Sequence, residues 1–245
     1  FVFAQDGAYS VAQRCTCRGV RLPAPPVPAR FADASFAGFA AKNPVLKRAK
    51  AVVQKFAEHY PMVEGGLVLM GPAGSGKTHL VCALLSQIQR KGLPAYYYDF
   101  RELLREVRAT FDRESGTTQA EVLDPLLHAP LCVIDGVGDE APRDWVNEQL
   151  ALIVNRRYNE KLVTIVTSRF FDERTLGELA DARLVAGIDP ALLPGKDGAI
   201  PKGTGLTLEE RIGAALLSRF YEMCQFVPMP AEDYRVHIKK EVFPR

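Results

Sequence analysis

The residues best suited to chemistry form one short run in the first third of the chain. Residues 71–78 fit the pattern G-x-x-x-x-G-K-[ST], in which glycines let successive backbone N–H groups turn inward around a phosphate. In this pattern the lysine reaches the β- and γ-phosphates of a nucleoside triphosphate, and the hydroxyl at the last position is a ligand for Mg²⁺. The sequence therefore predicts a phosphate-binding loop made of Gly71, Pro72, Ala73, Gly74, Ser75, Gly76, Lys77, Thr78 and the adjoining His79.

A phosphate-binding loop of this kind needs a strand before it and a helix after it. Residues 67–70 are four consecutive apolar residues, which is typical of a buried parallel strand. Residues 79–88 contain no helix breaker and predict a helix, whose N-terminus adds partial positive charge. A glycine-rich turn ahead of a core helix is the structural alternative, but the two flanks together favour binding of a nucleoside triphosphate.

A second candidate residue ends another apolar run. Residues 131–134 are apolar and lead directly to Asp135, at the position where P-loop ATPases hold Mg²⁺, directly or through water. The intervening chain has room for one strand, at residues 94–98, and one amphipathic helix, at residues 101–111. Residues 162–168 predict a further parallel strand. We therefore expect Thr78 and Asp135 to meet at one edge of a parallel sheet and to hold the metal there.

Composition limits the class of protein. With 245 residues, 47% of them hydrophobic and 24% charged, the chain is expected to be a soluble globular protein of one or two domains. A net charge of +2 means that any nucleic-acid surface must be a local patch. No apolar run approaches the length of a membrane span, and five scattered cysteines favour a reducing cytoplasm. A start at Phe1 without Met is what a fragment of a longer protein would show.

Residues 1–30 are expected to form a separate segment or linker. The prolines at residues 23–28 exclude a helix or a central strand, which places a boundary there and a second unit at residues 31–245. Cys15 and Cys17 supply half the ligands of a structural zinc site. On the residues alone they are two free thiols, unless lost upstream residues completed a zinc ribbon. The three aromatic residues of 31–39 predict either a contact with adenine or a cover on the core.

Several of these runs resemble the bacterial replicative-helicase loaders, the DnaC/DnaI group of AAA+ ATPases, to which the transposition helper IstB is closely related. The runs that carry the resemblance are residues 31–39, 67–80, 98–104, 134–138, 164–168, 212–219 and 233–235. The resemblance implies an α/β fold, a three-layer AAA+ P-loop NTPase with a central, mainly parallel sheet. It also implies a homo-oligomer that uses ATP and Mg²⁺ and works with the replicative DNA helicase and single-stranded DNA. In that family a zinc- or helicase-binding region often precedes the ATPase, so residues 1–30 are interpreted as its possible remnant.

The resemblance also assigns roles by position. Lys77 and Asp135 are catalytic, and Arg219 matches an arginine finger that acts in trans on the ATP of a neighbouring subunit. Arg235 is a weaker match to a γ-phosphate sensor. On the helix at residues 101–111, Arg101, Arg105 and Arg108 share one face where loaders contact DNA, although an ordinary solvated face would look the same.

Two departures from the family pattern bear on hydrolysis. Loaders usually carry Asp or Glu directly after the metal-binding Asp, and Gly136 stands there instead. Glycine cannot activate water, so either Asp139 or Glu140 substitutes, of which Glu140 is the catalytic candidate, or hydrolysis is slow. The usual sensor Asn is replaced by Arg169. The sequence therefore predicts a helicase loader with weak ATPase activity; the alternatives are an IstB-like transposition helper that binds duplex DNA and a P-loop kinase of a small molecule.

Overall fold

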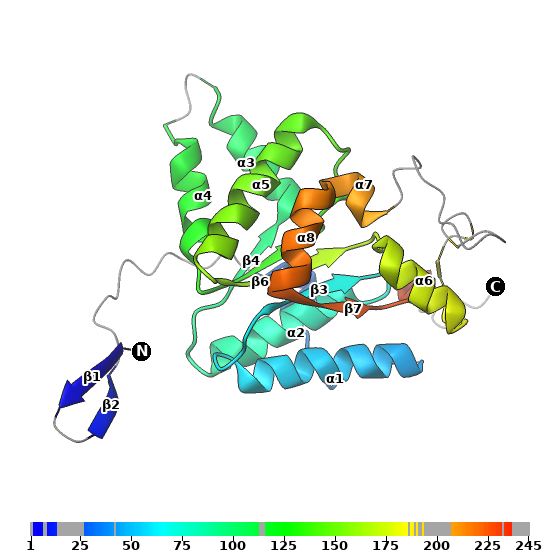
Figure 1. Cartoon of the computed structure of the whole chain (residues 1–245), viewed down its shortest axis with the longest axis horizontal. Helices are drawn as coiled ribbons and strands as arrows, with labels where there is room; N and C mark the ends of the chain where they lie inside the picture. The colour runs from blue at the N-terminus through cyan, green and yellow to red at the C-terminus, as the bar shows by residue number, and fades with distance from the viewer. Residues whose placement is uncertain are drawn as a thin grey trace.

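Five parallel strands form the middle layer of the protein, in the order β4-β5-β6-β3-β7 (Figure 1). The strands are β3 (Gly66–Met70), β4 (Tyr96–Asp99), β5 (Leu131–Asp135), β6 (Val163–Ser168) and β7 (Cys224–Pro228). The computed structural model describes residues 2–6, 9–13, 27–41, 43–112, 116–185, 187–188, 190, 193, 207–231 and 233–236. The expected parallel sheet is confirmed.

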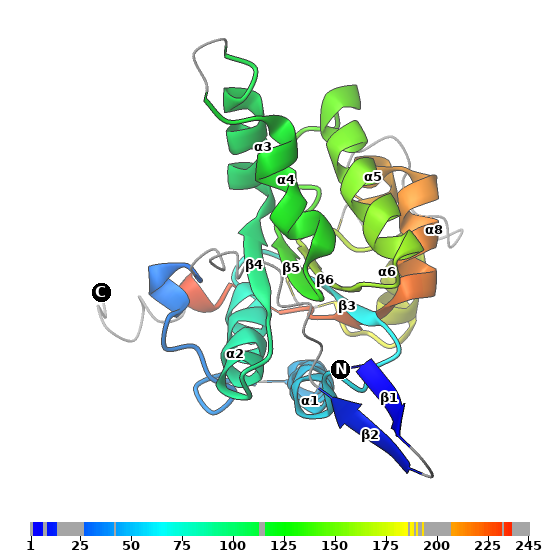
Figure 2. The same ribbon diagram turned by 90° about the vertical axis from the view of Figure 1, so that its left-hand side faces the viewer.

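Helices cover both faces of this sheet, which explains why its central strands are continuous apolar runs (Figures 1 and 2). Leu67 and Leu69 of β3 point into a core shared with α1 and α2, whereas Val68 and Met70 point into the core on the other face. The first face is covered by α1 (Pro44–His59) and α2 (Lys77–Arg90). The opposite face is covered by α3 (Phe100–Ala109), α4 (Gln119–His128), α5 (Asp144–Asn159) and α8 (Ala214–Met223). The α/β fold is thus three-layered.

The strand register brings the carboxyl ends of neighbouring strands to the same edge. Met70 at the end of β3 pairs with Ser168 at the end of β6, and Asp99 of β4 pairs with Asp135 of β5. Backbone hydrogen bonds extend the alignment past the strands, from Gly71 N to Ser168 O (3.1 Å). Residues directly after β3, β5 and β6 are therefore neighbours, although they are far apart in the chain.

Some elements differ from the expectation. The sequence patterns assigned no element to the stretches that form two helices, α4 and α6 (Glu173–Asp181), and the strand β7. The chain from residue 208 onward forms two consecutive helices, α7 (Leu208–Ile212) and α8. The chain turns between them at Gly213, which has a φ of +85°, and this left-handed backbone ends the first helix. A capping box starts α7, with Thr207 and Glu210 as partners.

The N-terminal segment contains a hairpin separate from the main sheet, formed by β1 (Val2–Asp6) and β2 (Tyr9–Gln13). A 3-10 turn, η1 (Ala29–Phe31), leads into the layered part. Cys15 and Cys17 lie outside the described residues, so the zinc interpretation and the boundary near residue 30 stay predictions. None of the helices in the described ranges is long and apolar enough to cross a membrane.

Candidate nucleotide-binding site

The loop at residues 71–78 has the backbone that its glycines predict. Gly74 and Gly76 have φ angles of +74° and +97°, in the left-handed region that other residues rarely adopt. A side chain at Gly76 would also collide with the ring of Phe39, 2.5 Å from the place of its Cβ. The loop turns directly into α2, which begins at Lys77, so the first N–H groups of the helix point toward the loop.

Lys77 lies across this loop. Its ammonium donates hydrogen bonds to the carbonyl oxygens of Gly71 (2.7 Å) and Pro72 (2.9 Å). Burial lowers the pKa of Lys77 to about 8, and the negative charges of Asp135 and Asp139 oppose that shift. A phosphate beside the ammonium would add further negative charge and favour the protonated form, which is the charge state that phosphate binding needs.

Asp135 is buried and fixed by three hydroxyl groups at the end of β5. Thr78 Oγ1 donates to Asp135 Oδ2 at 3.0 Å, and the hydroxyl of Tyr97 donates to the same oxygen at 2.7 Å. The hydroxyl of Thr167, at the end of β6, donates to Oδ1. Burial and the neighbouring Asp135 carboxylate raise the pKa of Tyr97, which keeps it a hydrogen-bond donor. Thr78 and Asp135 therefore lie side by side, as expected.

This arrangement fits Mg²⁺ by its chemistry. Magnesium prefers oxygen ligands and commonly takes one or two from the protein and the rest from phosphates and water. Thr78 and Asp135 offer oxygens only, and within the described ranges no three His, Cys, Asp or Glu side chains cluster to form a complete metal cage. The pair thus suits a metal that arrives with a nucleotide, while its role as the metal site remains a proposal.

A tight turn after Asp135 carries the next acidic residue back toward the site. Gly136 and Gly138 have φ angles of +83° and +86°, and Gly136 N donates to the Thr167 hydroxyl at 3.0 Å. Asp139 then forms an ion pair with Arg169, with Oδ1 and Nε 3.1 Å apart. Burial raises the pKa of Asp139, and the positive charge of Arg169 opposes this.

Glu140 has a different partner. Its carboxylate forms an ion pair with Arg101 Nε at 2.8 Å, so the expected catalytic carboxylate and an expected DNA contact are paired with each other. Arg105 pairs with Glu102 on the same helix at 2.8 Å. Both arginines keep exposed side chains, and the catalytic role of Glu140 stays a prediction.

The segment that enters the layered part and the segment that leaves it both contact the phosphate-binding loop. The buried Phe39 packs against His79, with ring centroids 5.7 Å apart, and His79 Nε2 is hydrogen-bonded to Ser35 O at 2.9 Å. From the other end, Tyr234 N donates to Gly74 O at 3.2 Å. Arg235 directly follows Tyr234 in the chain, and its positive charge lowers the pKa of Lys77; its sensor role stays a prediction.

Arg219 lies elsewhere. Its guanidinium donates to Ala215 O of the same helix at 3.1 Å and lies 5.9 Å from the centre of the Tyr158 ring. These contacts are on α8 and α5 rather than at the loop of the same chain. They leave the proposed action on a neighbouring subunit untested.

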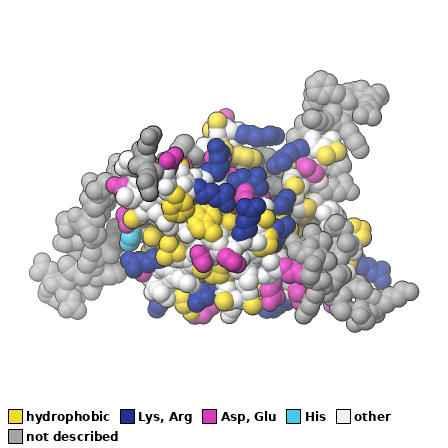
Figure 3. Space-filling view, turned by 90° about the horizontal axis from the view of Figure 1, so that it is seen from above, with side chains coloured by type: hydrophobic (Ala, Val, Ile, Leu, Met, Phe, Trp, Pro, Cys, Tyr) yellow, Lys and Arg dark blue, Asp and Glu magenta, His cyan; other side chains and the backbone are white. Residues whose placement is uncertain are grey.

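Sequence reasoning missed an aromatic group beside the arginine row. Arg108 stacks over the ring of Trp145 at 4.6 Å, and Phe111 meets the same ring edge-on at 6.3 Å. Phe111 is 60% exposed, which is unusual for so large an apolar side chain. Figure 3 views the side of the molecule on which α3 to α5 project and shows basic side chains gathered around apolar ones. The sequence feature that could have indicated this group is Phe111, an aromatic residue that follows the arginines just after the end of α3.

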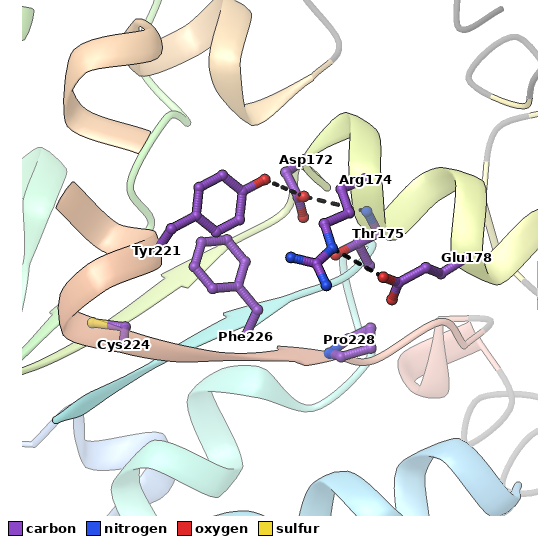
Figure 4. A pocket seen from close by; sticks show the side chains of 8 residues that line it. All are labelled: Asp172, Arg174, Thr175, Glu178, Tyr221, Cys224, Phe226 and Pro228. Carbon is purple, nitrogen blue, oxygen red and sulfur yellow. Dashed lines mark hydrogen bonds and ion pairs between the residues drawn. The ribbon is translucent and has the colours of Figure 1, made fainter. Parts of the chain in front are cut away.

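A cavity of about 270 Å³ lies away from the loop, between α6, α8 and β7 (Figure 4). Asp172 lines it but is fully buried, and its Oδ2 accepts hydrogen bonds from Tyr221 (2.5 Å) and Thr175 N (3.2 Å). This carboxylate caps α6 through Oδ2, while its buried Oδ1 has no hydrogen-bond partner among the described residues. The cavity shares no residue with the phosphate-binding loop, so it does not supply the substrate pocket that a small-molecule kinase would need there.

The parallel sheet, the phosphate-binding loop after β3 and the carboxylate after β5 together define a nucleotide-binding protein of the P-loop class. Solved structures specify the class as AAA+. The protein superposes on the crystal structure of the DnaC helicase loader with a TM-score of 0.63 and 25% identity, over 82% of this chain and 99% of that one. The AMPPCP-bound DnaA of Aquifex aeolicus shares the fold, with a TM-score of 0.57 and 17% identity, over 86% of this chain and 54% of that one.

Sequence comparison specifies the family. A family model described as "IstB-like ATP binding protein" matches residues 12–192, more than half of the chain, and the chain therefore belongs to that family. Among curated proteins, the replicative helicase loader DnaC of Escherichia coli strain K12 is 27% identical over 145 residues. That match covers 58% of this chain and 57% of the relative, so the chain spans little more than half the length of the curated relatives it matches.

Proposed function

We propose that the protein is an ATP-dependent loader of a replicative DNA helicase. The observation that carries the proposal is the pairing of Thr78 with Asp135 beside Lys77, because it completes a nucleotide site in a fold that covers 99% of a solved DnaC loader. The similarity to curated DnaC loaders supplies the helicase as the partner. The proposal implies a cytoplasmic location, and the buried free thiols Cys82, Cys132 and Cys224 are consistent with a reducing compartment.

Within this proposal the chain's own groups bind and orient ATP. Backbone N–H groups of the loop and the start of α2 hold the β-phosphate, and Lys77 leaves its two carbonyl partners to reach the β- and γ-phosphates. Mg²⁺, when bound, would be held by Thr78 and Asp135 and would neutralise charge on the β- and γ-phosphates. Tyr97 and Thr167 keep the Asp135 carboxylate in position for this role.

Single-stranded DNA is the proposed nucleic-acid ligand. Arg101, Arg105 and Arg108 supply positive charge on α3. Phe111, which is 60% exposed and packs edge-on against the half-buried Trp145, supplies aromatic surface on which bases can stack. Bases of a duplex are already stacked on each other, so this combination favours a single strand. The arginines attract phosphates of either form, and the aromatic pair provides the discrimination.

Assembly would couple nucleotide state to function. In a homo-oligomer, Arg219 of one subunit would reach the ATP of the next, where its charge stabilises the transition state. ATP at the interface would then favour the assembled, DNA-gripping state over the dissociated one. We propose that turnover is slow in the absence of DNA and the helicase, so that ATP acts mainly as a switch.

The test is a pull-down with the organism's replicative helicase, performed with ATP, with ADP and without nucleotide. We expect capture of the helicase by the wild-type protein with ATP, and loss of the nucleotide dependence for Lys77→Ala. Failure to bind under every condition would count against loading. Folding of the variant is checked by circular dichroism, so that a misfolded protein is not scored as a loss of binding.

The family match favours a second candidate function, that of an IstB-like transposition helper. This protein would assemble on duplex DNA and recruit a transposase. Fluorescence anisotropy with matched single-stranded and duplex oligonucleotides separates the two functions, because a loader prefers the single strand. A P-loop kinase is a third possibility, and its turnover would be unaffected by Arg219→Ala.

A further inference from the structure

The sequence has no carboxylate at position 136, but the carboxylate of Asp139 lies close to that position. A Cβ built on Gly136 would lie 3.5 Å from Oδ2 of Asp139. The turn through Gly136 and Gly138, with left-handed φ angles at both, folds the chain back so that a side chain three residues later reaches the neighbourhood of the missing one. Asp139 thus presents a carboxylate oxygen beside the residue directly after Asp135.

Arg169, the second departure from the family pattern, contacts the carboxylate that lies beside Gly136, the first departure. Arg169 follows β6 where a sensor Asn is usual, and its Nε lies 3.1 Å from Asp139 Oδ1. Arg169 also approaches the backbone oxygen of Asp139, at 3.5 Å from its terminal nitrogen. The pair fixes one oxygen of Asp139 and leaves Oδ2 on the side of Gly136.

Asp139 also lies within the electrostatic reach of the nucleotide site. The positive charges of Arg169, Lys77 and Arg101 favour its ionised form, while burial and the charge of Asp135 oppose ionisation. Glu140, the other acidic residue of this turn, is instead drawn to Arg101 on α3 at 2.8 Å. Of the two, Asp139 is the one whose charge raises the pKa of Lys77.

We propose that Asp139 is the catalytic carboxylate of ATP hydrolysis in this protein, and that Arg169 is its positioning residue. The proposal rests on the proposed function, since it assumes that ATP is bound by the loop at residues 71–78. Gly136 replaces an acidic residue and Arg169 replaces the sensor Asn, and the two replacements then form one paired change. Each would be damaging alone, and together they move the carboxylate from position 136 to position 139.

The step is an ordinary hydrolysis. The oxygen of a water molecule forms a bond to the γ-phosphorus, and the bond between that phosphorus and the β,γ-bridging oxygen breaks, so that its electron pair leaves with ADP. The proton lost by the water passes to Asp139 Oδ2 and then to solvent. The products are ADP and inorganic phosphate, and no oxidant or further reactant is required.

The experiment compares Asp139→Asn with Glu140→Gln in the full chain, with and without single-stranded DNA. Phosphate release measures turnover, and a fluorescent ATP analogue measures nucleotide affinity independently. We expect Asp139→Asn to lower kcat at least a hundredfold, the range of general acid–base catalysis, with affinity within about threefold of the wild type. Glu140→Gln should lower kcat less than tenfold. Asp124→Asn, an exposed carboxylate on α4, is the matched control and should change neither quantity.

Arg169 is tested by rescue. Arg169→Ala should lower kcat while KM changes less than about threefold, and Arg169→Lys should recover part of the loss because it keeps a positive charge near Asp139 Oδ1. A structural role alone would give equal effects for the two variants. Equal kcat for Arg169→Lys and Arg169→Ala would therefore overturn the positioning role.

The outcomes separate this inference from the proposed function. If the wild type binds no nucleotide, the proposed function fails and this inference with it. If the wild type binds and hydrolyses ATP while Asp139→Asn turns over as fast, or Glu140→Gln is the more damaging change, only this inference is overturned. ATP binding without any hydrolysis, even with DNA and helicase present, would also overturn it and leave the loader proposal standing.

Discussion

Gly136→Asp restores a carboxylate at the position where related ATPases carry one, yet we expect it to destabilise the protein and leave turnover no higher. Two penalties arise at this residue. Its φ of +83° is left-handed, which costs an L-residue roughly 1–2 kcal/mol. Its Cβ would lie 3.5 Å from Asp139 Oδ2, which brings two carboxylates close together.

The repulsion can be bounded from this geometry. Two unit charges about 4 Å apart repel by about 4 kcal/mol at an effective dielectric constant near 20. The Asp139 side chain is 33% exposed, so solvent screens the interaction, and we take about 1–2 kcal/mol. With the backbone penalty, Gly136→Asp should cost roughly 2–4 kcal/mol. Each kcal/mol corresponds to a fall in Tm of about 2–4 °C for a domain of this size.

Gly92→Asp is the matched control. Gly92 has a φ of +73° and no atom within 4 Å of the place of its Cβ, so it carries the backbone penalty without the contact. Thermal unfolding of both variants, and of Gly136→Asp combined with Asp139→Asn, isolates the contact as a coupling energy. The reasoning is refuted if Gly136→Asp costs no more than Gly92→Asp, or if Asp139→Asn relieves none of the loss.

Other predictions concern the core and the DNA surface. Arg157 is fully buried and donates to Leu126 O, Ala129 O and Val163 O. Arg157→Met removes these donors and should lower the free energy of unfolding by roughly 1–3 kcal/mol for each carbonyl oxygen left unsatisfied, measured by urea titration followed by Trp145 fluorescence. Phe111→Ala should weaken single-stranded DNA binding by roughly 5- to 150-fold in anisotropy, at about 1–3 kcal/mol per stacked base, because its exposed ring is where a base can stack. Met62→Ala, which removes an exposed apolar side chain elsewhere, should have no effect; equal losses would contradict the stacking role. Burial raises the pKa of the Cys132 thiol from 9 to about 12, so the thiol of the unfolded chain ionises first as the pH rises. The free energy of unfolding should therefore fall between pH 9 and 12, by up to about 1.4 kcal/mol per pH unit. A Cys132→Ala variant with the same pH slope as the wild type would contradict this.

The pairing of Thr78 with Asp135 could be predicted because each depends on a local pattern. An apolar run followed by a glycine loop, and an apolar run followed by Asp, both mark the carboxyl end of a parallel strand, and such ends meet at one edge of a sheet. The order of the strands was not needed for that conclusion. It was enough that the two strands belong to the same sheet.

Other features depend on strand order and on long-range packing, which no local pattern encodes. Asp139 meets Arg169 because β5 and β6 are adjacent, and the same adjacency brings Thr167 to Asp135. Trp145 meets Phe111 because α5 packs beside the end of α3. Strand β7 was missed because its five residues carry a half-apolar pattern, and it becomes a strand only through pairing with β3.

The contacts of Phe39 and Tyr234 have a mechanical consequence. The segment that enters the layered part packs Phe39 beside Gly76. The segment that leaves it is hydrogen-bonded to the loop, from Tyr234 N to Gly74 O. Asn43 Nδ2 ties the two segments together by donating to Pro230 O at 3.1 Å, and Figure 2 shows them on the same side of the molecule. A displacement of either segment would therefore act on Gly74 or Gly76, the two residues whose left-handed backbone shapes the loop at residues 71–78.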